Sequence, residues 1–255
     1  MTALSVNLNA VAQLRNRRDL PWPSVVGIAR VVLDAGADGI TVHPRPDERH
    51  IRRTDVFELE VLLRADYPHA EYNIEGYPSE AFLQLVEAAR PNQVTFVPDD
   101  PAQATSDHGW DIAANRELLE RGIDVMKALG IRVSLFIDAD PAAPARAWEV
   151  GADRVEIYTG PYGASYGTTT GADELNKLSE TANAAKVVGH NARAARPGLG
   201  INAGHDLTLV NLPALQAAVP GIDEVSIGHA ITADALLMGF PKAVRKYKAA
   251  LAGAS

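Results

Sequence analysis

The stretch Leu33-Asp-Ala-Gly-Ala-Asp-Gly-Ile-Thr-Val-His43 decides the fold, because it joins the end of a helix to the start of a buried strand. Gly36 stands where the helix must end, and glycine takes the left-handed conformation there at little cost. The same pattern returns at residues 148–158 and 219–229. A joint that recurs along the chain predicts a repeated unit of helix and strand.

Eight apolar, strand-like runs carry polar residues at their ends. They span residues 4–9, 39–43, 71–75, 93–97, 131–138, 154–159, 199–205 and 224–229. Between them the apolar spacing is helical, as at Ala81, Leu85 and Ala89. This alternation predicts an α/β protein, a single-domain (β/α)8 TIM barrel over residues 1–255 with extra helices. The strand C-termini form the catalytic face of that fold, so we expect the polar residues to meet in one mouth.

The composition suits one large domain. With 255 residues, 47% of them hydrophobic, the chain can bury a full core. No apolar run approaches the ~20 residues that span a bilayer, and residues 1–10 lack the charged and apolar regions of a signal peptide. We therefore expect a cytoplasmic protein with no membrane partner. The absence of cysteine excludes a disulfide framework, a thiol nucleophile and a thiolate metal site.

The distribution of charge indicates the kind of ligand. A net charge of -8 argues against nucleic-acid binding, which needs clustered Lys and Arg. Arginine is nevertheless dense early in the chain, at Arg15, Arg17, Arg18, Arg45, Arg49, Arg52 and Arg53. A local basic patch in an acidic protein favours small anionic ligands.

Three segments are longer than a barrel requires. Residues 98–111 are rich in Pro, Asp, Ser and Gly, and they are either a lid over the catalytic face or a surface insertion. Residues 160–171 either touch substrate or form a flexible loop. The sequence of residues 173–195 is typical of one extended helix, and we expect its polar face to be solvated.

Three residues on strand runs are candidates for acid–base chemistry. His43 is either a core histidine or part of a substrate mouth, and Arg45 two positions later favours the mouth. Glu75 ends the third run, where the desolvation of a carboxylate favours proton transfer over a salt bridge to an arginine. Glu156 lies inside its run and is expected to point into the barrel, where structural and electrostatic roles both remain open.

The last two runs carry the clearest signal for an anion. Asn202-Ala-Gly-His205 and Ile227-Gly-His-Ala230 occupy the usual phosphate-binding position of barrel enzymes, and their glycines let backbone N–H groups approach an oxyanion. These residues predict a phosphorylated substrate, with His205 either contacting phosphate or transferring protons. The other histidines, His50, His69, His108 and His190, are expected at the solvated surface by default, although His50 lies within the arginine-rich segment.

Two other enzyme classes fit less well. A Schiff-base aldolase needs a lysine at a strand end, but all the lysines fall in helical stretches, at Lys127, Lys177, Lys186, Lys242, Lys246 and Lys248. A metal-dependent hydrolase needs clustered ligands, and the first run has no His-x-His pair. A metal held by His43, Glu75 and His205 remains the minor alternative.

Several motifs stand together along the chain: Val6-Asn-Leu-Asn9, Leu14-Arg-Asn16, residues 35–43, Arg45, Arg49-His50, residues 133–140, residues 155–160, Asn202-Ala-Gly-His205, Leu207-Thr208 and Ile227-Gly-His-Ala230. Their joint resemblance to the pyridoxine 5′-phosphate synthase family runs from Leu4 to about Leu251. It implies the condensation of 1-deoxy-D-xylulose 5-phosphate with 3-amino-2-oxopropyl phosphate to pyridoxine 5′-phosphate, phosphate and water, without metal or organic cofactor. It also implies a homo-oligomer, an octamer of barrels.

Residue roles follow from the same resemblance. It makes His43 and Glu75 proton acceptors and His205 a proton donor, with Glu156 supporting the transition state. The substrate-binding residues that it implies are Asn7, Asn9, Arg18, Arg45, His50, Thr105, Asp206, Gly228 and His229. Thr105 falls in the candidate lid, which the family closes over its substrates.

The chain departs from the family pattern at a few positions. Asn9-Ala10 stands where many members have Asp-His, and Asp206 replaces a usual glycine. Residues 160–171 and 191–200 also appear longer or differently built. A non-catalytic binder of a phosphorylated vitamer or sugar is therefore the alternative, but the retained His43, Glu75 and His205 favour an enzyme.

Overall fold

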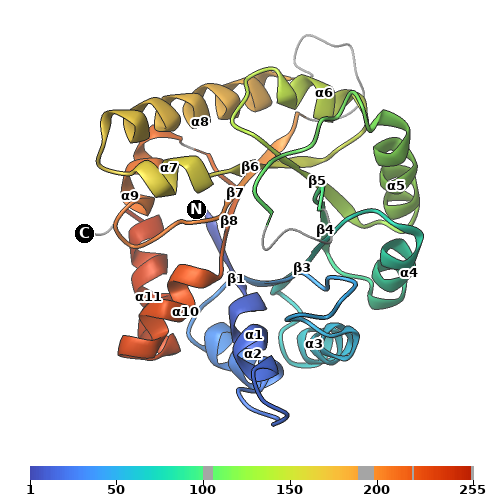
Figure 1. The fold of residues 1–255 in the computed structure, drawn as a ribbon, viewed down its shortest axis with the longest axis vertical. Helices are drawn as coiled ribbons and strands as arrows, with labels where there is room; N and C mark the ends of the chain where they lie inside the picture. The colour runs from blue at the N-terminus through green and yellow to red at the C-terminus, as the bar shows by residue number, and fades with distance from the viewer. Residues whose placement is uncertain (100–105, 189–197, 220, 254–255) are drawn as a thin grey trace.

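The computed structural model describes residues 1–99, 106–188, 198–219 and 221–253. Eight parallel strands form a closed barrel in chain order, and the last strand pairs with the first (Figure 1). The strands are β1 (Ala3–Asn7), β2 (Gly39–Val42), β3 (Glu71–Gly76), β4 (Gln93–Phe96), β5 (Arg132–Ile137), β6 (Arg154–Tyr158), β7 (Gly200–Gly204) and β8 (Glu224–Ile227). The predicted (β/α)8 barrel is confirmed, with strand ends a residue or two from those expected.

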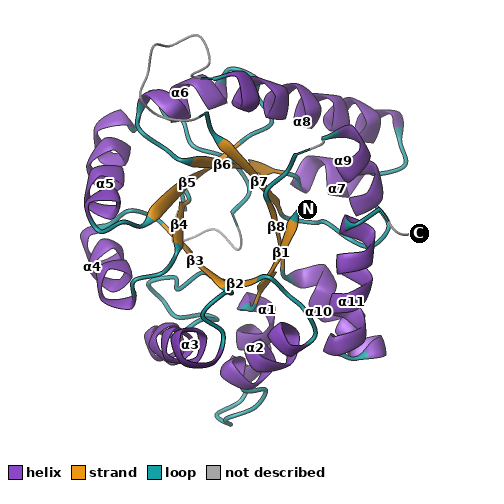
Figure 2. Ribbon diagram, turned by 180° about the vertical axis from the view of Figure 1, so that it is seen from behind, coloured by secondary structure: helices purple, strands orange, loops and turns teal. Residues whose placement is uncertain are grey.

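The helices surround the barrel as an outer ring (Figure 2). They are α1 (Asn9–Asn16), α2 (Val25–Asp34), α3 (Arg53–Asp66), α4 (Glu80–Ala89), α5 (Arg116–Ala128), α6 (Ala143–Glu149), α7 (Gly160–Ser165), α8 (Thr169–Val187), α9 (Leu212–Ala218), α10 (His229–Met238) and α11 (Phe240–Leu251). All six lysines lie in α5, α8 or α11, as predicted. Within the residues that the structure describes, none of the helices combines the length and hydrophobicity of a membrane-spanning segment.

The repeated joint does more than end a helix. Gly36 has a φ of 104°, the left-handed conformation predicted for it. The aspartate that follows accepts a hydrogen bond from a neighbouring strand: Oδ2 of Asp38 accepts from the N–H of Leu4 on β1 at 2.7 Å. Asp153 and Asp223 repeat this contact with the N–H groups of Val133 and Ile201, at 2.9 and 2.8 Å. The joint therefore also aligns each strand with its neighbour.

The flexible-loop alternative for residues 160–171 is wrong, and the predicted long helix is present with different bounds. Residues 160–171 are mostly helical, since they contain α7 and the start of α8. The hydroxyl of Thr168 accepts from the N–H of Gly171 at 3.1 Å, so α8 is capped there and begins at Thr169 rather than at residue 173. It ends at Val187, short of the predicted residue 195. Residues 189–197, with His190, lie outside the described part of the chain.

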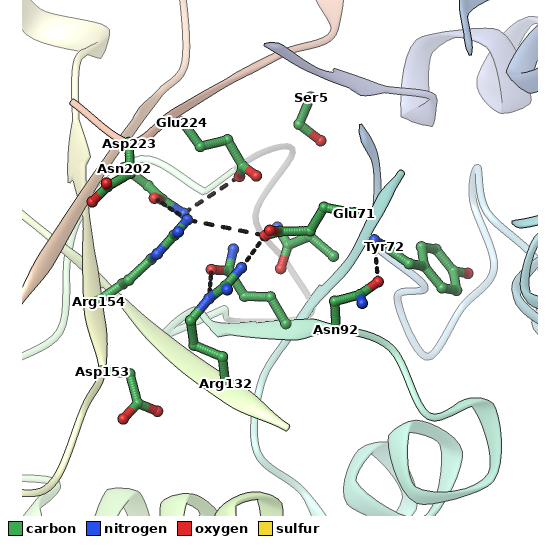
Figure 3. Close-up of polar contacts among 12 residues, drawn as sticks. Ser5, Glu71, Tyr72, Asn92, Arg132, Asp153, Arg154, Asn202, Asp223 and Glu224 are labelled. Atoms are coloured by element: carbon green, nitrogen blue, oxygen red, sulfur yellow. Dashed lines mark hydrogen bonds and ion pairs between the residues drawn. The ribbon is translucent and has the colours of Figure 1, made fainter. Parts of the chain in front are cut away.

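Charged side chains fill the N-terminal end of the barrel (Figure 3). Arg132 pairs with Glu71, and Nη1 of Arg154 donates to Oδ1 of Asn202 at 3.0 Å. Nδ2 of Asn202 donates in turn to Glu224 at 3.3 Å. Burial, followed by the charge of Glu71, raises the pKa of Glu224 well above its usual range. Asn202 thus contributes to the barrel interior and not to the catalytic mouth.

Candidate active site

A cavity of about 410 Å³ opens at the C-terminal ends of the strands. Ten of the predicted site residues line it: Asn7, Asn9, His43, Arg45, His50, Glu75, His205, Asp206, Gly228 and His229. They follow or end β1, β2, β3, β7 and β8 and are far apart in the chain. The barrel brings them together because the C-terminal ends of its parallel strands lie at one rim.

His43 is held between two carboxylates. Its Nε2 lies 2.7 Å from Oδ2 of Asp99, and its Nδ1 lies 3.8 Å from Oε2 of Glu75. Its backbone N–H donates to Oδ1 of Asn9 at 2.9 Å. All three ionisable side chains are at least nine-tenths buried. Asp99, which follows β4 directly after Pro98, was missed by the sequence analysis, although it ends a strand run as the other candidates do.

Glu75 lies on β3 and is 4% exposed. Nδ2 of Asn7 donates to its Oε2 at 3.4 Å, a long hydrogen bond. Burial, followed by the charges of Glu156 and Asp99, raises the pKa of Glu75 well above its usual range, against a lowering by Arg45. A carboxyl group of raised pKa can exchange a proton where a surface carboxylate would stay ionised.

Glu156 and His205 form a second buried pair. Glu156 points into the barrel as predicted, and its Oε1 lies 3.9 Å from Nδ1 of His205. Neither carboxylate oxygen of Glu156 has a hydrogen-bond partner among the described residues, and burial raises the pKa of Glu156 to about 7. Burial, opposed by the charge of Asp206, lowers the pKa of His205 to about 4. A Cβ at Gly204 would come within 2.4 Å of Glu156, so glycine there makes room for the carboxyl group.

The backbone at His205 is strained. His205 and Asp206 have φ angles of 79° and 55°, a region that costs an L-residue roughly 1–2 kcal/mol. The hydroxyl of Thr159 lies 2.6 and 2.5 Å from the carbonyl oxygens of Gly204 and His205, and Nδ2 of Asn211 donates to the carbonyl of Asp206 at 2.9 Å. These contacts hold His205 over the cavity. A glycine at position 206 would adopt this conformation without strain.

The N-terminus of α10 forms one end of the cavity. Gly228 precedes the helix, and a Cβ there would lie 3.1 Å from Cβ of Asn7, so the close approach of β1 and β8 favours glycine. His229 and Ala230, in the first turn of α10, line the cavity beside it. The free N–H groups and the dipole of this turn favour an anion, as the sequence analysis predicted for this position.

Arg45 and His50, in the segment after β2, form another polar part of the cavity lining. Both side chains are buried, so the default expectation that His50 is at the surface is wrong. Burial, followed by the charges of His43 and Arg45, lowers the pKa of His50 to about 4. Arg15 is also buried: its Nη2 donates to the carbonyl of His50 at 3.1 Å, and both terminal nitrogens bond to Asp55. Arg15 therefore holds the backbone at His50 in place, and its guanidinium is not available to bind a substrate.

Two predicted site residues lie outside the cavity lining, and a third is not among the described residues. Glu156 lies inside the barrel, and Arg18 is exposed in the turn after α1, away from the cavity lining. Thr105 belongs to residues 100–105, outside the described part of the chain, so the candidate lid there stays a prediction. Ser106 lines the cavity and was missed; its hydroxyl donates to Oδ1 of Asp99 at 2.7 Å. His69 and His108 are exposed, as predicted.

Comparison with known proteins gives the family. The model of the family "Pyridoxal phosphate biosynthesis protein PdxJ" matches residues 4–253. The chain belongs to this family. It is 58% identical over 250 residues to pyridoxine 5′-phosphate synthase of Brucella anthropi and 56% identical over 251 residues to that of Brucella abortus. Each match covers 98% of both chains, so the relatives share the whole length of the barrel.

Solved structures of lower identity share the fold alone. Tryptophan synthase from M. tuberculosis superposes with a TM-score of 0.61 at 14% identity, covering 99% of this chain and 92% of that chain. Thiamine phosphate pyrophosphorylase from Pyrococcus furiosus gives a TM-score of 0.59 at 14% identity, covering 99% and 96%. At this identity a shared fold carries no information about the residues of the site in this PdxJ family member.

The cavity residues combine groups for proton transfer with groups that can bind an anion. His43, Glu75 and His205 can exchange protons, and the guanidinium of Arg45 and the first turn of α10 line the same cavity. In the described ranges, no group of three or more His, Asp or Glu side chains has the arrangement of a metal site. The geometry thus supports general acid–base chemistry on a phosphorylated ligand.

Proposed function

We propose that this protein is a pyridoxine 5′-phosphate synthase, and that the whole chain forms one catalytic domain. It would condense 1-deoxy-D-xylulose 5-phosphate with 3-amino-2-oxopropyl phosphate to pyridoxine 5′-phosphate, releasing phosphate and water. The observation that carries this proposal is the gathering of His43, Glu75 and His205 in one cavity of a chain that matches the family over its full length. We propose no metal or organic cofactor for the reaction.

The proposed chemistry divides the proton transfers among these residues. Imine formation, enolisation, phosphate loss and ring closure each move a proton at a defined atom. His43 and Glu75 would accept protons and His205 would donate one, with Glu156 supporting the transition state from below. His205 is neutral in the free protein at pH 7, since its pKa is lowered to about 4. A substrate phosphate beside it would favour the imidazolium and prepare it to donate.

The two ends of the cavity would bind the two phosphorylated substrates. We assign the deoxyxylulose phosphate to Asn7, Asn9, Arg45 and His50, with Arg18 and Thr105 as further contacts implied by the family. We assign the phosphate of the amino ketone to Gly228, His229 and the backbone at Asp206. Asn7 Oδ1 accepts from the N–H of Asn9 at 2.9 Å, which aligns these two residues at the start of α1.

The test of this function is turnover by the purified protein. Incubation with both substrates should yield pyridoxine 5′-phosphate and inorganic phosphate in equal amounts, and excess chelator should leave the rate unchanged. Tight binding of either substrate without product would favour the alternative, a non-catalytic binder. Loss of turnover in chelator, restored by a divalent ion, would overturn the metal-free mechanism.

Replacing Arg45 with alanine should raise the KM for deoxyxylulose phosphate roughly ten- to a hundredfold. A charge-assisted hydrogen bond to phosphate contributes roughly 1.5–3 kcal/mol, and Arg45 is buried at the cavity wall. Steady-state kinetics with each substrate varied in turn measures the effect. Arg53→Ala is the matched control, because Arg53 belongs to the same arginine-rich segment but is exposed away from the cavity. An unchanged KM would remove Arg45 from the binding site.

We also propose that the protein is a homo-oligomer, an octamer by its family. Helices α1 and α10 contact each other (Figure 1). Exposed apolar side chains lie on these helices and on the turn after α1: Leu14, Trp22, Leu236 and Leu237, with Leu237 87% exposed. A second copy of the chain is the partner that would bury this patch. Light scattering measures the mass. We also propose a cytoplasmic location, and the net charge of -8 supports the proposal that the protein has no nucleic-acid partner.

A further inference from the structure

The two ring nitrogens of His43 meet their carboxylates at unequal distances. Nε2 lies 2.7 Å from Asp99, within hydrogen-bond distance, whereas Nδ1 lies 3.8 Å from Glu75, beyond it. In a neutral imidazole one nitrogen carries the proton and the other a lone pair. A lone pair on Nε2 would be repelled by a carboxylate oxygen at 2.7 Å, so the short contact favours the proton on Nε2. Nδ1 is left as the atom that can take a proton from a substrate.

Asp99 is held as an anion for this contact. Nη2 of Arg45 lies 3.1 Å from the same oxygen that faces His43, and Ser106 donates to the other oxygen at 2.7 Å. Burial alone would raise the pKa of Asp99, but the hydrogen bond from His43, its charge and the bond from Ser106 outweigh it and lower the pKa. A buried, hydrogen-bonded carboxylate on the far nitrogen of a histidine orients the ring and stabilises the imidazolium that forms.

We infer that Asp99 is a positioning residue for His43: it fixes the ring with Nδ1 as the proton acceptor and stabilises the ring once it is charged. This inference rests on the proposed function for its kinetic consequence, but the tautomer it assigns belongs to the protein alone. Through Asp99, which lies just after β4, the segment that follows this strand would also contribute to catalysis.

Other charged or titratable groups also face the ring of His43. Glu75 lies beyond Nδ1, Arg45 shares the oxygen of Asp99, and the ring of His50 lies 6.1 Å away, centroid to centroid. Arg45 and a charged His50 disfavour the imidazolium, while the two carboxylates favour it. Removing the charge of Asp99 should therefore leave the charged ring of His43 less well stabilised.

The kinetic test is Asp99→Asn, which keeps the size of the side chain and removes its charge. We expect kcat to fall roughly 10²- to 10⁴-fold with little change in either KM, and the acidic limb of the pH profile of kcat/KM to move to lower pH. Asp99→Glu should recover part of kcat. Asp107→Asn is the matched control, because its side chain lies in the same segment but is 58% exposed and outside the cavity lining. A rise in KM with kcat unchanged would mean that Asp99 acts through Arg45, and would overturn the inference.

A second measurement needs no turnover. Solid-state NMR of protein carrying ¹⁵N-labelled histidine, with the His43 signals assigned by their loss in His43→Gln, reports the tautomer directly. We expect the Nε2–H form in the wild-type protein and a mixture of tautomers in Asp99→Asn. The Nδ1–H form in the wild-type protein would overturn the inference even if the variant failed to fold. Because this readout is independent of substrate, it separates failure of the inference from failure of the proposed function.

Discussion

Replacing Glu75 with glutamine should slow turnover by about 10²- to 10⁴-fold and leave both substrates bound. The amide keeps the size of the carboxyl group and can still accept the long hydrogen bond from Asn7, but it cannot take up a proton. The raised pKa of Glu75 and its place in the cavity make proton transfer the step that suffers. Single-turnover rates with both substrates saturating measure the chemical step without product release.

The control for this substitution is Glu87→Gln, on the exposed face of α4. It changes the same chemical group outside the lining of the candidate active site and should turn over at the wild-type rate. A Glu75→Gln enzyme that also ran near the wild-type rate would make Glu75 structural, and the proton path through it would be wrong. Circular dichroism and the binding of each substrate alone establish that the variant is folded.

Replacing Glu156 with glutamine should raise the free energy of unfolding, relative to the wild-type protein, more at high pH than at low pH. Burial raises the pKa of Glu156 from 4.5 to about 7 in the folded protein. A carboxyl group with a raised folded pKa contributes its full stability below the unfolded pKa and loses it as the pH rises toward the folded pKa. The window is therefore about pH 4.5 to 7, and the wild-type protein should lose roughly 3 kcal/mol relative to the variant across it.

Urea unfolding of both proteins across this range, at one protein concentration, measures the difference in free energy of unfolding. The difference between wild type and Glu156→Gln should grow with pH and level off above about pH 7. Glu87→Gln should show no such trend, because its carboxyl group is exposed. A pH-independent difference for Glu156→Gln would mean that Glu156 is already ionised at pH 5 and has a compensating partner.

The barrel itself was predictable because its signals are local. Each strand is a short apolar run, and each joint such as residues 33–43 carries its own helix stop and its own buried strand. The eight strands appear at their predicted places for this reason. Residues 160–171 were misjudged because a run of Gly, Ser and Thr is typical of a loop, while the packing of α7 against α8 and of Gly163 against Asp206 overrides that preference.

Much of the candidate site was also predictable, since a rim position follows from a strand end. His43, Glu75 and His205 each end or follow a strand, and the closed barrel places them around one cavity. The roles assigned to these three residues come from the family resemblance, because the spacing of residues along the chain does not reveal which group accepts or donates a proton. The burial of His50 could not be predicted from its neighbours in the sequence, because it depends on Arg15 of α1, which binds the carbonyl of His50 from 35 residues away.

The amino-acid sequence by itself therefore determined the eight-stranded barrel, the rim at which the candidate site lies and the family to which the chain belongs. Only the tertiary structure decided the partners: Asp99 on His43, Glu156 beneath His205, and the aspartates of the joints on neighbouring strands. The physical reason is range. Strand and helix preferences act over a few residues, whereas a hydrogen bond or a shifted pKa depends on which distant side chains the closed barrel brings within about 4 Å.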